Sequence, residues 1–361
     1  MKLSYKILSV FGIDIELHLF FILFILAFVI ISPPLAFLLI LIFFFVTLHE
    51  LTHSIVAIRN KIKVRRIILL PIGGMAMVET TDIKPLTEIK MSLAGPLLNI
   101  TIVYICLVIA YLFSLPLGSW LTQFFDPTGA FALPLPELVL FYSFYGNLIL
   151  GVFNLLVPAF PLDGGRILRA LLALRLEYVR ASRIAKNISL VIAGSMFLVS
   201  FLFGEIWIMI IAFFIGFGAV AEFDAMVMHK ALMKIRTGDV LSKSFLTVKP
   251  SDSISSVLAK MLQKRTVDAL VRTKTGLRSI SLADISRMPR GEWKKRAISI
   301  AKPTVHATIN TSIEGIVKRM ELEQISIIPV FDGKKLIGVV ERSNIERMIK
   351  IVGMLGDSSS R

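Results

Sequence analysis

Six long apolar stretches lie within the first 230 residues of this 361-residue chain, and they constrain its fold more than any other feature. Most of them approach the roughly 20 residues that a helix needs to cross the hydrocarbon of a bilayer. Hydrophobic residues make up 55% of the chain, more than the core of an ordinary soluble protein of this length requires. The sequence therefore predicts a polytopic α-helical membrane protein of about six transmembrane helices. The predicted spans are residues 17–31, 35–58, 89–113, 138–158, 184–203 and 206–227.

Lysine and arginine are distributed unevenly among the connections between these stretches. They precede the first stretch and follow the second, fourth and sixth, whereas residues 32–34, 114–137 and 204–205 contain none. Basic loops of membrane proteins stay on the cytoplasmic side. We therefore expect a multi-pass protein of the cell membrane with both termini in the cytoplasm. The connection 114–137 is too short for a PDZ-like insertion, and the absence of such an insertion argues against a periplasmic peptide sensor.

The second apolar stretch contains an H-E-x-x-H motif that runs from His49 to His53. On a helix the two histidines lie one turn apart on the same face, so both imidazoles reach one Zn2+, while Glu50 is offset toward the water on the metal. A chance occurrence is the alternative, but ionisable groups are costly in hydrocarbon without a partner or a function. His49 precedes Arg59 by ten residues, or about 15 Å of helix. The fold must therefore supply a polar channel to that depth.

A third protein ligand is needed, because two imidazoles and a water leave a tetrahedral zinc one ligand short. Asp163 is the favoured donor, since it lies where the fourth apolar stretch is interrupted. Pro158 and Pro161 break the helix there, and Gly164 and Gly165 predict an irregular turn. The alternative is that Asp163 caps a helix that begins near Gly165.

Together these motifs resemble those of the site-2 protease family of intramembrane zinc metalloproteases. Two further segments match the family, P-I-G-G-M-A at residues 71–76 and A-G-P-L-L-N at residues 94–99, and the resemblance covers most of residues 1–228. It implies a zinc metalloendopeptidase that acts in regulated intramembrane proteolysis. It also implies residue roles: His49, His53 and Asp163 bind one Zn2+ per chain, Glu50 is the general base and acid, and Asn154 holds the substrate or the tetrahedral intermediate.

Two of these assignments keep an alternative. Asn154 is equally well explained as a side chain that satisfies the carbonyl groups freed by Pro158. Residues 64–78 predict a re-entrant β-hairpin with Gly73 and Gly74 at its substrate-binding segment. A single-span transmembrane substrate is a helix that must unwind before hydrolysis, and an exposed strand edge can pair with the extended chain. The alternative for the hairpin is a purely structural loop.

Residues 229–361 are polar and predict a soluble cytoplasmic domain. They hold 25 of the 40 Lys and Arg residues but only 12 of the 25 Asp and Glu residues. A repeat with a period near 60 residues is visible, because the segment beginning at residue 246 is echoed from residue 303. The two copies, about 239–290 and 297–350, resemble a tandem cystathionine-β-synthase (CBS) pair. The chain is thus expected to combine a transmembrane metalloprotease domain, 1–228, with a soluble α/β domain, 229–361.

The CBS resemblance implies an adenine nucleotide such as ATP or AMP as a ligand and regulator. The first copy keeps the Ser-x-x-Asp pattern at Ser281 and Asp284, while the second has Asn344 in place of the aspartate. The basic surface suits the phosphates of a nucleotide and the anionic lipid bilayer equally well. Aromatic residues are nearly absent from it, which argues against nucleic acid. A homodimer through the CBS domains is a further expectation.

Two other classes of protein share part of these features. A CBS-regulated transporter or channel would also be polytopic and basic, but it has no need of H-E-x-x-H paired with Asp163. A proteolytically inactive membrane chaperone would be expected to have lost Glu50 or a ligand, and all of them are present. The sequence identifies neither the substrate nor the bond that is cleaved.

Overall fold

The computed structural model describes residues 3–71, 73–78, 83–115, 118, 120, 133–273, 276–333 and 335–358. The chain divides into two compact units, Met1–Phe223 and Asp224–Arg361. The division falls inside the long helix α8 (Ile206–Lys234). Most of the connection 114–137 lies outside the described residues, so the expectation about a PDZ-like insertion stays a prediction.

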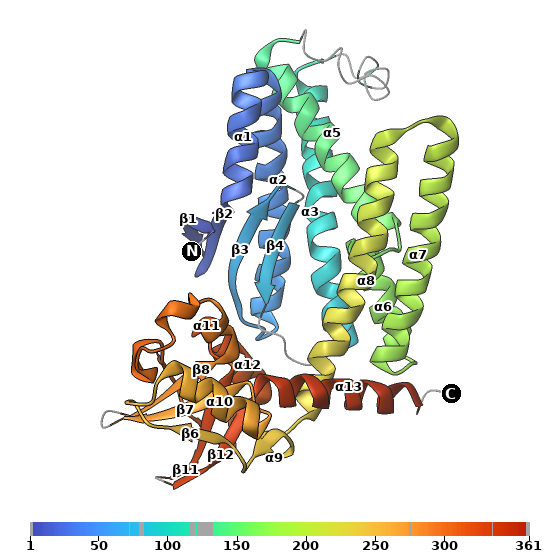
Figure 1. Cartoon of the computed structure of the whole chain (residues 1–361). Helices are drawn as coiled ribbons and strands as arrows, with labels where there is room; N and C mark the ends of the chain where they lie inside the picture. The colour runs from blue at the N-terminus through green and yellow to red at the C-terminus, as the bar shows by residue number, and fades with distance from the viewer. Residues whose placement is uncertain are drawn as a thin grey trace. The chain divides into compact units, whose positions relative to one another are not determined.

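Apolar helices make up most of the first unit (Figure 1). In the described part of the chain, five helices are long and apolar enough to cross a membrane: α2 (Pro33–Arg59), α3 (Pro85–Leu112), α5 (Leu135–Leu156), α7 (Tyr178–Phe203) and α8. A further apolar helix, α1 (Leu19–Ile31), has only 13 residues. Proline is well accommodated in the first turn of a helix, and α2, α3 and α5 each have one among their first two residues. These helices confirm the predicted polytopic helical fold.

A four-stranded sheet accompanies the helices of the first unit. Its strands are β1 (Ser4–Val10), β2 (Ile13–His18), β3 (Val64–Leu70) and β4 (Gly73–Val78), in that spatial order. β2 and β3 are parallel, and the two outer pairs are antiparallel. The predicted hairpin is therefore present as β3 and β4, but it continues into two N-terminal strands that the sequence did not predict. A bulge between Lys6 and Leu8 interrupts the alternation by which β1 could have been recognised. β2 alternates apolar and polar residues from Ile13 to His18, so a signal for that strand was available.

One face of this sheet packs against the first two helices. Ile13, Ile67 and Leu69 are buried in a cluster with Phe21 of α1 and Phe43 of α2. The aromatic rings of Phe21 and Phe43 meet edge to face, with centroids 4.6 Å apart. The opposite face carries ion pairs, including one between Lys6 and Asp14 at 2.6 Å. β3 and β4 are thereby held beside α2 (Figure 1), and Gly74 of β4 lies against Glu50 of the H-E-x-x-H motif.

The interruption after α5 is short and is packed by glycine. α5 ends at Leu156, and six residues separate it from the amphipathic helix α6 (Asp163–Ala173). Gly164 and Gly165 lie in the first turn of α6, rather than in the irregular turn that the sequence suggested. A Cβ atom on Gly165 would lie 2.4 Å from the backbone of Ala159, and one on Gly164 would lie 2.4 Å from the carbonyl oxygen of Val157. These glycines let α6 begin directly against the break.

A buried charged cluster joins α3, α6, α7 and α8. Arg169 donates to Glu88 through Nε at 2.8 Å, and the hydroxyl of Tyr178 donates to the other oxygen of Glu88 at 3.1 Å. Glu222 of α8 lies 3.4 Å from both Arg169 and Arg166. Buried charges are costly unless they are paired and hydrogen-bonded. The cluster therefore fixes how the start of α6 sits among three longer helices.

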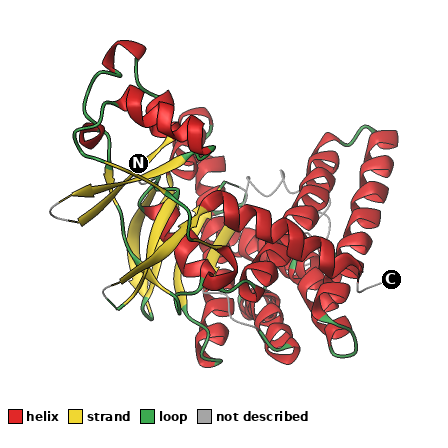
Figure 2. Ribbon diagram, turned by 60° about the horizontal axis from the view of Figure 1, so that its bottom comes forward, coloured by secondary structure: helices red, strands yellow, loops and turns green. Residues whose placement is uncertain are grey.

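The second unit is built from α and β elements, and its sheets are coloured yellow in Figure 2. Its first repeat contains β6 (Leu246–Val248), α10 (Ile254–Lys264), β7 (Asp268–Thr273), β8 (Gly276–Ser281) and α11 (Leu282–Ser286). The second contains β10 (Ala307–Thr308), α12 (Ile313–Leu322), β11 (Ile327–Asp332), β12 (Lys335–Glu341) and α13 (Arg342–Ser358). This is the strand–helix–strand–strand–helix order expected of two CBS repeats.

The two repeats exchange a strand. β5 (Leu241–Ser242), at the beginning of the first repeat, pairs with β12 of the second. β9 (Lys302–Pro303), at the beginning of the second repeat, pairs with β8 of the first. A small apolar cluster of Leu270, Ile327 and Val339 joins the repeats directly. Each sheet is completed by residues at the beginning of the other repeat, so the pair is expected to fold as one body.

Candidate functional site

Two helices bring the three predicted metal ligands together. His49 and His53 lie one turn apart on α2, and Asp163 is the first residue of α6. The Nε2 atoms of the two histidines are 3.0 Å apart, and each lies 3.2 Å from Oδ2 of Asp163. Among the described residues, these three form a group whose ligand atoms all lie within 4.8 Å of one another. Residues 114 positions apart in the sequence thus converge on one point.

The donor set fits a zinc ion. Ligands of tetrahedral zinc at about 2.0–2.1 Å from the metal are separated from one another by roughly 3.4 Å, close to the separations found here. The other imidazole nitrogens are already engaged. Nδ1 of His53 bonds the carbonyl oxygen of Met91 at 2.6 Å, and Nδ1 of His49 bonds Oδ1 of Asn99. Each Nε2 is therefore the nitrogen left to face a metal, and two imidazoles with one carboxylate leave a fourth position open.

One face of α3 packs against His49 and His53. Met91, Gly95 and Asn99 are spaced four residues apart, so they lie along one side of the helix. A Cβ atom on Gly95 would lie 2.4 Å from Nε2 of His53 and 2.7 Å from Nε2 of His49. Real Cβ atoms do not approach other atoms so closely, so glycine is required at this position. The close approach explains the glycine of the A-G-P-L-L-N segment.

Glu50 lies between the histidine pair and the edge of the sheet. It is half-buried, and Gly74 of β4 packs directly on its side chain, since a Cβ on Gly74 would lie 2.6 Å from Cγ of Glu50. Gly73 has a φ of +138°, a backbone conformation that favours glycine. The two glycines of the predicted substrate segment thus allow an edge strand to lie against the predicted general base.

Asn154 is placed differently from the metal ligands. Its side-chain amide donates to the carbonyl oxygen of Leu150 at 2.9 Å, one turn earlier in α5. Pro158 follows one turn later and has no N–H to bond the carbonyl of Asn154. This bond tests neither of the two predicted roles, so the role of Asn154 as an oxyanion donor stays a prediction.

The sequence reasoning overlooked a second asparagine of α5. Asn147 is fully buried, and its Oδ1 accepts from Nδ2 of Asn99 at 2.7 Å. A signal for it was available, because a polar side chain inside an apolar span almost always faces the interior of the bundle. The partner was not predictable, since Asn99 and Asn147 are 48 positions apart.

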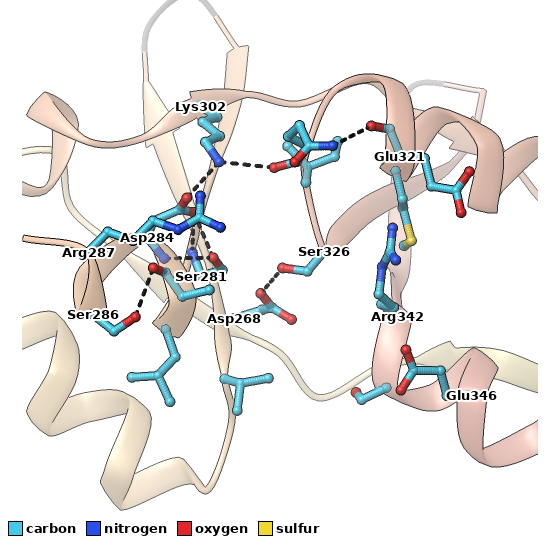
Figure 3. Close-up of a pocket in the computed structure, with 17 residues that line it drawn as sticks. Asp268, Ser281, Asp284, Ser286, Arg287, Lys302, Glu321, Ser326, Arg342 and Glu346 are labelled. Atoms are coloured by element: carbon cyan, nitrogen blue, oxygen red, sulfur yellow. Dashed lines mark hydrogen bonds and ion pairs between the residues drawn. The ribbon is translucent and has the colours of Figure 1, made fainter. Parts of the chain in front are cut away.

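The second unit contains a cavity of about 740 Å³ that both CBS repeats line. Ser281 and Asp284, the two residues of the Ser-x-x-Asp pattern, both lie in its wall (Figure 3). They also bond each other. The backbone N–H of Ser281 donates to the Asp284 carboxylate at 3.1 Å, and its hydroxyl donates to the same carboxylate at 2.7 Å. The backbone N–H of Asp284 donates back to Ser281 Oγ at 3.1 Å. This reciprocal arrangement caps the N-terminus of α11.

Lys302 reaches across the pocket in Figure 3. Its Nζ lies 2.6 Å from Oδ1 of Asp284 and donates to the carbonyl oxygen of Gln324 at 3.0 Å. Burial raises the pKa of Asp284, but the hydrogen bonds from Lys302 and Ser281 outweigh burial and bring the pKa below its ordinary value. Asp284 is therefore an ionised carboxylate that is already paired with a cation.

Asp268 forms the floor of the same pocket. It is 2% exposed and accepts a hydrogen bond from the hydroxyl of Ser326 in the second repeat. Burial raises the pKa of Asp268, the bond from Ser326 opposes that rise, and the charge of Asp284 adds to it. Arg342 and Glu346 line the opposite wall. The pocket thus contains both acidic and basic groups.

Comparisons with known proteins agree with this geometry. Residues 37–135 match the model of peptidase family M50, and residues 296–351 match that of the CBS domain. The chain is 32% identical over 357 residues to zinc metalloprotease MJ0392 of Methanocaldococcus jannaschii, covering 98% of each chain. It is 31% identical over 146 residues to stage IV sporulation protein FB of Bacillus subtilis, covering 40% of this chain and 43% of that protein.

Among solved structures, the site-2 protease from Methanocaldococcus jannaschii is 38% identical, with a TM-score of 0.45, and covers 61% of this chain and 94% of its own. The match to a named zinc metalloprotease over 98% of the chain, at 32% identity, is the decisive comparison. The protein therefore belongs to peptidase family M50, the site-2 protease family of zinc metalloproteases, and carries a C-terminal CBS domain.

Proposed function

We propose that this metalloprotease is an intramembrane endopeptidase that hydrolyses the transmembrane segment of a single-span substrate protein. One observation carries the proposal: His49 and His53 lie on the apolar helix α2, Asp163 joins them at the break that follows the apolar helix α5, and Glu50 lies beside the group against the edge of a sheet. A zinc protease that acts on soluble proteins has no need to place its ligands on such helices. The positive charge of the connections supports cytoplasmic termini and a soluble fragment released to that side.

Each residue has a role that its position supports. His49, His53 and Asp163 would hold zinc, which supplies Lewis-acid chemistry that acidifies water and polarises a carbonyl group. Glu50 would accept the proton of the attacking water and deliver one to the leaving amine. Asn154 would donate a hydrogen bond to the developing oxyanion if its amide turns away from Leu150.

The edge strand β4 would hold the substrate in an extended form. β4 pairs with β3 on one side, and it is the last strand of the sheet on the other. A substrate helix hides its peptide bonds in its own hydrogen bonds, and pairing with a strand edge replaces those bonds once the helix unwinds. Because Gly74 contacts Glu50, a chain paired along β4 would pass close to the general base.

The test uses the full-length protein in detergent with model single-span substrates, with and without a zinc chelator. Glu50→Gln is expected to keep stoichiometric zinc and to lose about 100- to 10,000-fold in cleavage rate, the range for removal of a general base. His49→Ala, His53→Ala and Asp163→Ala are expected to lose zinc as well. Full activity in Glu50→Gln would overturn the protease mechanism, and stoichiometric zinc in Asp163→Ala would move the third ligand elsewhere.

We further propose that the CBS pair, residues 229–361, binds an adenine nucleotide and that this binding regulates the protease. The pocket supports the proposal, since it offers Asp284 for a ribose and three cationic residues, Arg287, Lys302 and Arg342, for phosphates. Regulation requires that the nucleotide prefer one of two arrangements of the protein, because tight binding without such a preference shifts no equilibrium.

Calorimetric titration of the full-length protein with ATP, AMP and S-adenosylmethionine tests the binding step, with Asp284→Ala as the variant expected to bind weakly. Cleavage assays at saturating nucleotide test the coupling. No heat of binding with any of the three would leave the CBS pair as a dimerisation or docking module. Binding without a change in the cleavage rate would leave a nucleotide site uncoupled from proteolysis.

A further inference from the structure

A continuous chain of hydrogen bonds runs from the backbone of α5 to His49. The amide Nδ2 of Asn147 donates to the carbonyl oxygen of Ser143 at 2.7 Å, and Oδ1 of Asn147 accepts from Nδ2 of Asn99 at 2.7 Å. Oδ1 of Asn99 then faces Nδ1 of His49. Both asparagines are completely buried. The chain links three helices, α5, α3 and α2.

The direction of this chain is set at one end. A backbone carbonyl only accepts hydrogen bonds, so Asn147 must turn its amide nitrogen toward Ser143 and its oxygen toward Asn99. Asn99 must then present its own nitrogen to Asn147, which leaves its oxygen toward His49. An oxygen acceptor at Nδ1 requires a proton on that nitrogen, and a neutral imidazole with its proton on Nδ1 has its lone pair on Nε2.

The two histidines reach this state by different means. His53 donates directly to the carbonyl oxygen of Met91, which no side-chain substitution removes. The hydrogen bond at Nδ1 of His49 depends on two side chains, Asn99 and Asn147. Substitutions can therefore disturb the orientation of His49 but not that of His53. The difference supplies an internal comparison within one metal centre.

We infer that Asn99 and Asn147 are positioning residues that hold His49 in the Nδ1-protonated tautomer and aim its Nε2 at the metal. The inference rests on the proposed role of His49 as a zinc ligand. Outer hydrogen-bond partners of this kind commonly affect metal affinity about 10- to 100-fold. Asn99 is expected to act directly on His49, and Asn147 to act only through the orientation of Asn99.

The test measures zinc affinity of the full-length protein in detergent by competition with a chromophoric chelator, together with the absorption spectrum of the cobalt-substituted protein. Asn99→Leu is expected to weaken zinc binding about 10- to 100-fold and to alter the cobalt bands. Asn147→Leu should act in the same direction but less strongly, and the double variant should be no weaker than Asn99→Leu, because both act through one bond to His49. Asn99→Asp keeps an acceptor for Nδ1 and should bind zinc about tenfold more tightly than Asn99→Leu.

Thr101→Val is the matched control, because Thr101 lies on the same helix and its hydroxyl bonds the carbonyl of Leu97. It should leave zinc affinity and spectrum unchanged. Wild-type affinity and spectrum in a folded Asn99→Leu, or equal weakness of Asn99→Asp and Asn99→Leu, would overturn the inference. If Asn99→Leu fails to fold, Asn147→Leu and Asn99→Asp decide. His49→Ala separates the two claims: retained zinc there would refute the proposed ligand, whereas lost zinc there with unchanged zinc in the asparagine variants would refute only the positioning role.

Discussion

The metal centre and the CBS pocket differ in how their polar groups are satisfied before a ligand binds. In the metal centre, α3 engages the Nδ1 atoms of both histidines, and the remaining donor atoms converge at 3.0–3.2 Å. In the pocket, about 740 Å³ of space separates the walls, and Asp284 is already paired with Lys302.

Because of this difference, the metal centre and the CBS pocket should respond differently to substitutions. In the metal centre the ligand side chains are already arranged, so little free energy is spent on ordering them when zinc binds. The same close packing leaves no room for an additional atom. In the pocket, a ligand that binds the carboxylate of Asp284 must first break its contact with Lys302. Removal of the Lys302 cation can therefore strengthen the binding of such a ligand.

Gly95→Ala should have the largest effect, because its Cβ would lie within 2.7 Å of both imidazoles. Overpacking of this kind costs about 1–3 kcal/mol, and here it would be relieved by displacement of the zinc ligands. We expect loss of stoichiometric zinc and of proteolysis. Gly194→Ala is the matched control, since a Cβ there meets nothing within 4 Å. Metal analysis and cleavage assays measure both, and normal zinc in Gly95→Ala would show that the site is less tightly packed than described.

A proline in β4 should have a smaller effect, confined to turnover. Successive N–H groups of a strand point to opposite sides, so of Met75→Pro and Ala76→Pro one removes a donor on the outer edge. We expect that variant to cleave its substrate about tenfold more slowly, because one hydrogen bond between uncharged groups is lost. Its zinc content should be unchanged. Unchanged turnover in both would reduce the segment to a plain connector.

Lys302→Met tests the internal pairing of the pocket. Without its cation, Asp284 is free for the hydroxyl groups of a ribose, so binding of uncharged adenosine should become several-fold tighter. Binding of ATP should weaken, because a positive charge near its phosphates is lost. Calorimetry with both ligands measures the two directions, and weaker binding of adenosine would contradict the idea that Lys302 competes for Asp284.

Asp268→Asn should produce the smallest effect, seen only as a change with pH. Because the folded-state pKa of Asp268 is raised, the folded protein binds more protons than the unfolded chain between the two pKa values. The contribution of Asp268 to stability is therefore present below the unfolded pKa and is lost as pH rises through the folded pKa. Asparagine keeps a hydrogen-bond acceptor for Ser326 but does not ionise, so the variant does not lose this stability as the pH rises. The urea midpoint for unfolding of the second unit, measured by proteolysis, should be higher in Asp268→Asn than in the wild-type protein at neutral pH. At acidic pH the two midpoints should not differ in this way.

Local spacing predicted the chemistry of the metal centre but not its surroundings. His49 and His53 were predictable because a helical turn fixes their relation, and Asp163 because prolines mark the break before it. The bonds of Asn99 to His49 and Asn147 were not, since they join helices far apart in the sequence. β1 was missed because its bulge hides the alternation, and the contact of Lys302 with Asp284 because a β-strand and a helix cap meet only in the folded pair.

The short helix α1 has a consequence for the bilayer itself. Its 13 residues span about 20 Å, against about 30 Å of hydrocarbon. A strand edge cannot lie in lipid tails, so β1 and β2, which directly precede α1, cannot fill the difference as lipid-exposed backbone. The membrane beside α1 is therefore expected to thin. Since Phe21 of α1 meets Phe43 of α2, the headgroup layer would descend to about the level of His49. Acyl-chain length then becomes a determinant of how easily water enters, and longer lipids should slow this protease.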